Sequence, residues 1–288
     1  FSNVLPPYSG STKIRVEGGE VDNFYCAGSG RDRSVPTFSG ELDASITGGK
    51  VKKLYGSGSA AYVLKDSKVS VSVAGNGEVT DLFAAGKRWE TSFNPDQTEL
   101  KDVEKFGSFS GNETITVSGN AVVANIYASG EGYSGSTNYE GTKANAYLDG
   151  NVTINVEGGT VTGNVYGGGK GIVDPGYEQC ARVTENSKVE VNIAGGIVKG
   201  NVYGGGDVAD VLGSASVALS GGTVQGKVFG GGKVSDVEGS TSVTLSGATV
   251  QGNLYGGGEE GAVKGSTTVN VQNGTVNSSV YGGAYGKA

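Results

Sequence analysis

The residues best suited to bind a ligand or take part in a reaction lie in three stretches that interrupt an otherwise regular glycine-rich sequence. These insertions cover about 86–112, 129–150 and 170–187. Aromatic faces stack on sugar rings, while charged and hydroxyl groups supply hydrogen bonds, so this mixture is typical of a glycan-binding surface. The candidate ligand-binding residues are Arg88, Trp89, Tyr133, Tyr139, Tyr177 and Arg182.

The aromatic residues of the insertions also have a structural interpretation. Long loops are commonly packed down by their own side chains, and we favour this role for Phe93, Phe106 and Phe109. For Trp89 and its tyrosine counterparts, a binding role and a packing role both stay open.

Catalysis is the alternative to binding. Histidine is absent, which excludes His-based acid–base catalysis, Ser-His-Asp triads and His-ligated metals. A glycoside hydrolase needs two carboxylates about 5 to 9.5 Å apart, and the insertions offer many carboxylates without a motif that selects a pair. We therefore favour a non-catalytic protein and name no catalytic residue. A polysaccharide-degrading lyase or hydrolase is the alternative.

We predict no metal and no cofactor. Asp210 and Asp236 occupy equivalent positions in adjacent repeats and could share a cation, but such carboxylates are more often simply solvated. The run Gly167-Gly168-Gly169-Lys170 lacks the spacing of a phosphate-binding loop and is not followed by a helix.

The two cysteines, Cys26 and Cys180, fit no metal-ligand spacing. They belong to repeats that would be about 19 Å apart in an even stack. A disulfide needs Cα atoms within about 7 Å, so we expect unpaired cysteines.

Charge and hydropathy limit the partners. The net charge is −7, and no cluster of lysine and arginine is visible along the sequence, which argues against nucleic acid. No apolar run approaches the roughly 20 residues that span a bilayer, so we expect no membrane insertion. Glycan or a cell-surface protein is the expected partner.

The element that must position these residues is a short repeat. Its clearest copies are Gly158–Gly169 (GGTVTGNVYGGG), Gly195–Gly206, Gly221–Gly232 and Gly247–Gly258. The base period is 26 residues, and all extra residues fall after the aromatic-glycine step, so insertions should leave from one edge. The aromatic that aligns the copies recurs at Tyr25, Tyr55, Phe83, Tyr127, Tyr166, Tyr203, Phe229, Tyr255 and Tyr281.

Each repeat reads as three short strands with glycine at the corners. In 240–247, Val243 and Leu245 alternate with Ser and Thr, and Val250 and Leu254 share one face of the next run. A third short run surrounds Val263. Glycine permits the sharp turns of a three-sided coil.

The pattern VxVxGGxVxGxVYGGG resembles right-handed parallel β-helix proteins of the pectin-lyase-like type, especially glycine-rich repeats in surface and adhesin-like proteins of gut bacteria. The resemblance covers about Thr12 to Tyr281. It implies an all-β, single-stranded right-handed parallel β-helix (solenoid) of about nine coils. We expect one domain over 1–288, with 1–11 as a lead-in or cap. The alternative is antiparallel hairpins that form a β-prism or meander.

Three sets of equivalent residues predict ladders along the stack. The aromatics either form an outward strip for sugar rings or, as we favour, stack on one another over glycine backbone. Asn164, Asn201 and Asn253 predict an amide ladder. The residues that follow the glycines alternate in sign, which favours contacts between neighbouring coils; they are Lys170, Asp207, Lys233 and Glu259.

The resemblance and the insertions together predict a non-catalytic, adhesin-like module that is secreted or attached to a bacterial cell surface. It would be part of a longer chain and would present its insertion edge to a ligand. A purely structural stalk is a further alternative.

Overall fold

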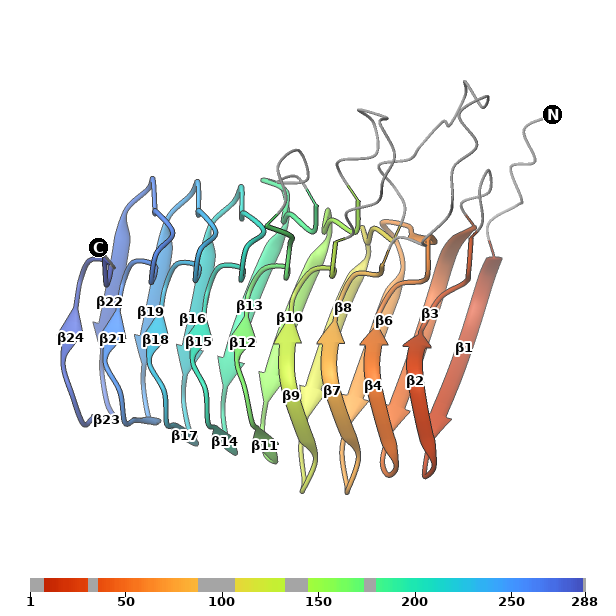
Figure 1. Ribbon diagram of the computed structural model, residues 1–288, viewed down its shortest axis with the longest axis horizontal. Helices are drawn as coiled ribbons and strands as arrows, with labels where there is room; N and C mark the ends of the chain where they lie inside the picture. Colours follow the sequence, from red (N-terminus) through yellow and green to blue (C-terminus); the bar gives the residue numbers. More distant parts are fainter. Residues whose placement is uncertain (1–7, 31–35, 88–106, 133–144, 174–179, 287–288) are drawn as a thin grey trace.

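The computed structural model shows an all-β solenoid in which parallel strands stack along one axis (Figure 1). It describes residues 8–30, 36–87, 107–132, 145–173 and 180–286. Within these residues the chain forms strands and turns and no helix. No helix of the described part is therefore long and apolar enough to cross a membrane.

The first sheet stacks one strand from each coil, where a coil is the run from one such strand to the next. Its main path is β1 (Tyr8–Val16), β3 (Thr37–Ile46), β6 (Lys68–Val73), β8 (Asn112–Val117), β10 (Asn151–Val156), β13 (Lys188–Ile193), β16 (Ala215–Leu219), β19 (Thr241–Leu245) and β22 (Thr267–Val271), and the short β5 (Tyr62–Val63) pairs with β3.

The strands of the second sheet become shorter along the stack. It begins with four six-residue strands, β2 (Glu20–Tyr25), β4 (Lys50–Tyr55), β7 (Glu78–Phe83) and β9 (Val122–Tyr127). Each later coil has two short strands instead. One set is β11 (Thr160–Val161), β14 (Ile197–Val198), β17 (Thr223–Val224), β20 (Thr249–Val250) and β23 (Thr275–Val276), and the other is β12 (Val165–Tyr166), β15 (Val202–Tyr203), β18 (Val228–Phe229), β21 (Leu254–Tyr255) and β24 (Val280–Tyr281).

One extra residue explains the split. Val161 pairs with Val123, and Val165 pairs with Ile126. The later coil therefore has one more residue between its two paired positions than the earlier coil has. The extra residue at the first split coil is Gly163, and a Cβ there would collide with the Asn125 side chain. Only glycine therefore fits this close approach, and the added residue interrupts the strand as a bulge does.

The third side of each coil is a ladder of single parallel bridges. It contains Val63, Phe109, Leu148, Val183, Val211, Val237 and Val263. The predicted insertions around 86–112 and 129–150 therefore include body residues such as Phe109 and Leu148, both fully buried. The third run predicted around Val263 is confirmed, but in coils with insertions a single bridging residue has no periodicity that separates it from the loop.

All strand pairs of the described residues are parallel and in register, which excludes the hairpin alternative. The inward residues of the three sides form one core of Val, Ile, Leu, Ala and Phe. β-Branched residues suit these positions because they pack well on a pleated surface. The expectation of an all-β parallel solenoid is confirmed.

The aromatic residues form a second buried cluster, which we call the aromatic ladder. Successive rings from Tyr25 to Tyr281 stack with centroids 4.8–5.1 Å apart and nearly parallel planes. Between Tyr55 and Tyr255 no ring is more than 4% exposed. The stacking interpretation is confirmed, and these rings are not available to sugars.

Candidate functional site

The insertions leave the solenoid from one row of charged residues. Each member stands four positions after an aromatic of the ladder, and the row, which we call the charge ladder, contains Lys87, Glu131, Lys170, Asp207, Lys233 and Glu259. The predicted insertions begin within two residues of Lys87, Glu131 and Lys170. Their bases therefore meet at one corner of three consecutive coils.

Glu131 is the centre of this corner. Its Oε1 accepts hydrogen bonds from Lys53 Nζ at 2.5 Å and Lys170 Nζ at 3.2 Å. Its Oε2 accepts a hydrogen bond from the Tyr55 hydroxyl at 2.6 Å and lies 3.9 Å from Lys87 Nζ. We call these five residues the corner site.

Burial and neighbouring charges set the protonation states of Glu131 and Tyr55 in the corner site. The Glu131 side chain is 11% exposed, while the three lysine side chains are 26–37% exposed. Burial by itself would raise the pKa of Glu131, but hydrogen bonds from Lys53 and Tyr55 and the charge of Lys170 lower it below the ordinary value. Burial and the Glu131 carboxylate raise the pKa of Tyr55, which stays a phenol and a donor.

The later members of the charge ladder each have a partner. Lys233 Nζ lies 2.9 Å from Asp207 Oδ1, and the Tyr203 hydroxyl donates to Glu259 Oε2 at 2.6 Å. The predicted contacts between opposite charges are thus present at the Lys233–Asp207 pair. The corner site differs because three lysines there surround one carboxylate.

A second polar row borders the aromatic ladder on its other side. The side-chain amides of Asn164, Asn201 and Asn253 each donate to the tyrosine hydroxyl two residues later. Their Oδ1 atoms accept backbone N–H groups from the next coil, so the predicted ladder is confirmed with amide-to-backbone bonds. Lys53 and Asp81 occupy this row in earlier coils, where Asp81 accepts a hydrogen bond from Asn125.

Of the predicted ligand-binding residues, the structure describes only one. Arg88, Trp89, Tyr133, Tyr139 and Tyr177 lie outside the described residues. Arg182 lies on the third side, where its Nη2 is 3.0 Å from Asp210 Oδ2.

The aspartates of this third side also bond along the stack. Asp210 accepts the backbone N–H of Asp236, and Asp236 accepts that of Ala262. Within the described residues, no group of three or more Cys, Asp and Glu side chains is placed to hold a metal ion.

Both cysteines are buried, and Cys26 belongs to the hydrophobic core. Cys26 and Cys180 form no disulfide with each other. The Asn145 amide donates to Cys180 Sγ at 3.2 Å. Burial and the nearby Glu113 carboxyl raise the pKa of the Cys26 thiol well above its usual range, which favours an unreactive thiol.

The corner site was missed by inspection of the sequence because its lysines are far apart along the chain. Lys53, Lys87 and Lys170 come from three different coils. A signal was nevertheless present, since Lys87, Glu131 and Lys170 share the same offset from their aromatics. The predicted ladder began at Lys170 and omitted its two earlier members.

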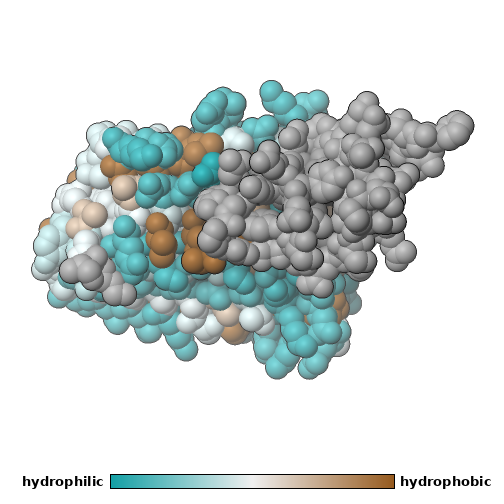
Figure 2. Space-filling model, turned by 45° about the horizontal axis from the view of Figure 1, so that its top comes forward, coloured by the Kyte–Doolittle hydropathy of each residue, from teal (hydrophilic) through white to brown (hydrophobic). Residues whose placement is uncertain are grey.

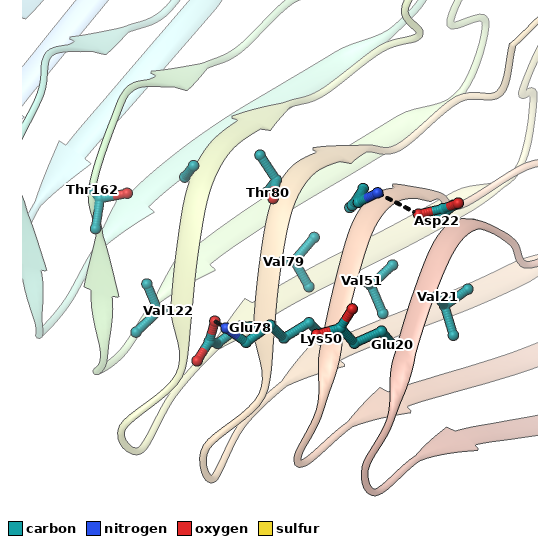
Figure 3. A pocket seen from close by; sticks show the side chains of 12 residues that line it. Glu20, Val21, Asp22, Lys50, Val51, Glu78, Val79, Thr80, Val122 and Thr162 are labelled. Carbon is teal, nitrogen blue, oxygen red and sulfur yellow. Dashed lines mark ion pairs between the residues drawn. The ribbon is translucent and has the colours of Figure 1, made fainter.

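A shallow groove of about 370 Å³ lies on the outer face of β2, β4, β7 and β9 (Figure 3). Its rim consists of ion pairs, with Lys50 3.2 Å from Glu78 and Lys52 2.6 Å from Asp22. These charges already satisfy one another, so the groove has less capacity for a charged ligand than the corner site.

The surface around the insertion edge is predominantly polar. In the view of Figure 2, the described hydrophobic residues form small separate patches among hydrophilic ones. Such scattered patches do not require a partner. Polar and charged groups are therefore the better guide to binding on this face.

Comparison of the chain with family models, curated proteins and solved structures found no match.

Proposed function

We propose that this chain is a non-catalytic, adhesin-like binding module that acts at a bacterial cell surface or after secretion. In this proposal it is a right-handed parallel β-helix of about nine coils whose insertion edge binds a glycan. The observation that carries the proposal is the convergence of three insertion bases, Lys87, Glu131 and Lys170, on one hydrogen-bonded corner.

The solenoid body supports a binding role because it can hold loops in fixed positions. The aromatic ladder stacks continuously, and the asparagine row is bonded from coil to coil. Loops on such a scaffold are the usual location of binding residues. The predicted aromatics Trp89, Tyr133 and Tyr177 belong to these insertions.

A panel of polysaccharides and host glycans tests the proposal, with binding and released product measured in the same samples. The wild-type chain is compared with Trp89→Ala/Tyr177→Ala. Tyr8→Ala is the control because Tyr8 is an exposed aromatic on β1, the N-terminal strand of the solenoid, and does not belong to any of the three insertions. We expect glycan binding without product, retained in the control and lost in the double variant.

The other outcomes identify the alternatives. Release of shortened sugar would replace the proposal with a polysaccharide-degrading enzyme. Absence of both binding and product would favour the structural stalk. The continuous aromatic ladder supports that role because it connects successive coils without a ligand.

A further inference from the structure

We propose that Lys53, Lys87 and Lys170 form a binding site for a tetrahedral oxyanion, namely a sulfate or phosphate ester carried on a glycan. This inference rests on the proposed glycan-binding function and names the group that the corner site would recognise. Its basis is a surplus of hydrogen-bond donors that the described residues leave unused.

The three lysines carry more N–H donors than the Glu131 carboxylate can accept. Each lysine ammonium group has three N–H donors, whereas a carboxylate offers about four acceptor positions. Glu131 serves all three ammonium groups and also accepts the Tyr55 hydroxyl. Several N–H groups thus remain for solvent or a ligand, and the lysines are sufficiently exposed to present them.

The local charge points in the same direction. Asp81, an acid of the second polar row, is the register neighbour of Lys53 and is counted with Glu131 in the local charge. The three ammonium groups exceed the Glu131 and Asp81 carboxylates by one positive charge. Asp207, the next acid of the charge ladder, already pairs with Lys233. A sulfate monoester, which carries one negative charge, would therefore neutralise the corner, whereas a phosphate monoester carries about −1.5 to −2 at pH 7 and would exceed the local positive charge.

The type of cation favours a tetrahedral anion. An arginine fork matches the two oxygens of a planar carboxylate, whereas lysine acts as a point charge without a preferred plane. The corner site contains three lysines, each from a different coil, that converge on one place. Three separate donors suit an anion with three free oxygens.

The net charge of −7 means that the field of the whole chain does not attract polyanions. Recognition must consequently come from contacts within the corner. These contacts are screened over roughly 8 Å at physiological salt, so binding should depend on the identity of nearby lysines rather than on total charge.

Titration calorimetry with dextrans of one length provides the test. The probes are dextran sulfate, phosphorylated dextran and neutral dextran. We expect wild-type protein to bind at least one charged dextran about tenfold more tightly than neutral dextran. The sulfated and phosphorylated probes distinguish the two sources of the oxyanion.

Three variants make the test specific. Lys53→Gln/Lys87→Gln/Lys170→Gln should lose the preference for the charged probe, and Lys170→Gln alone should weaken it if the triple variant unfolds. Lys233→Gln is the matched control, because Lys233 belongs to the same ladder but to a balanced pair. Glu131→Gln should strengthen binding several-fold, since it removes the competing carboxylate.

Equal binding of charged and neutral dextran, or equal losses in the Lys170 and Lys233 variants, would overturn the inference. Glycan binding that requires Trp89 but ignores the lysines would leave the proposed function standing without this site. A charged-dextran preference that requires the lysines but survives Trp89→Ala/Tyr177→Ala would support the site and refute the proposed role of the insertion aromatics.

Discussion

The hydroxyl of Tyr203 donates a 2.6 Å hydrogen bond to Glu259, which lies two coils further along the solenoid. The coil between them contributes Phe229, whose ring continues the stack without a hydroxyl group. The same arrangement occurs at the corner site, where Tyr55 donates to Glu131 and Phe83 lies between. Each phenylalanine of the aromatic ladder thus lies in the coil between a tyrosine and the glutamate to which that tyrosine donates its hydrogen bond.

Tyr203→Phe should destabilise the solenoid by about 1–2 kcal/mol, because the hydrogen bond to a carboxylate is lost while the ring stack is kept. Chemical denaturation at pH 7 measures the change. The control is Tyr166→Phe, whose hydroxyl accepts a hydrogen bond from the neutral Asn164 amide and should matter less. Equal losses in the two variants would contradict the importance of the acid.

Glu113 should be a source of instability that increases with pH. Its carboxyl is buried in the core, between Val69 and Val152 in the register, and neither oxygen has a hydrogen-bond partner among the described residues. Burial raises the pKa of Glu113 well above its ordinary value. As pH rises above the ordinary glutamate pKa of about 4.3, the unfolded chain releases this proton first, so the free energy of unfolding should fall.

Glu113→Val tests this expectation because it continues the valine row of the neighbouring strands. The variant should be more stable than wild type by about 1–3 kcal/mol at pH 7, with a smaller difference near pH 4. Glu157→Gln, at an exposed glutamate, is the control and should change stability by less than about 0.5 kcal/mol. A less stable Glu113→Val at pH 7 would show that the carboxyl has a stabilising partner.

Glu131 should have the opposite dependence on pH. Its lowered pKa means that the folded state holds the ionised form, so its stabilising effect is present above the ordinary glutamate pKa. This contribution disappears as pH falls through the lowered pKa. Denaturation midpoints between pH 7 and pH 3 should therefore fall more steeply in wild type than in Glu131→Gln. Parallel curves would show that the lysines and Tyr55 do not favour the carboxylate.

Gly200→Ala should be strongly destabilising, by about 2–4 kcal/mol. Gly200 is the extra residue that splits the second-sheet strand of its coil, and a Cβ there would collide with the Gly163 carbonyl oxygen and the Asn164 side chain. Thermal unfolding measures the loss. Gly18→Ala is the control, because nothing lies within 4 Å of its added Cβ. A neutral Gly200→Ala would mean that adjacent coils can separate at this corner.

The sequence alone predicted the parallel solenoid and the stacked aromatics, and it placed the insertions on one edge. These features repeat at a fixed offset, and equivalent residues of a solenoid must lie next to one another. The same reasoning correctly placed Asn164 and Asn201 in one ladder. It did not distinguish Leu148 from its insertion, because one bridging residue per coil has no pattern of its own.

Only the tertiary structure decided which unlike positions meet. Lys53 stands before its aromatic and Lys170 after its own, yet both reach Glu131 because long side chains cross from one row to the next. Tyr55 reaches Glu131 two coils away because Phe83 leaves the hydroxyl position empty. A repeat alignment fixes which residues share a row, whereas contacts between rows depend on side-chain length, direction and burial. The corner site and the buried Glu113 belong to that second class.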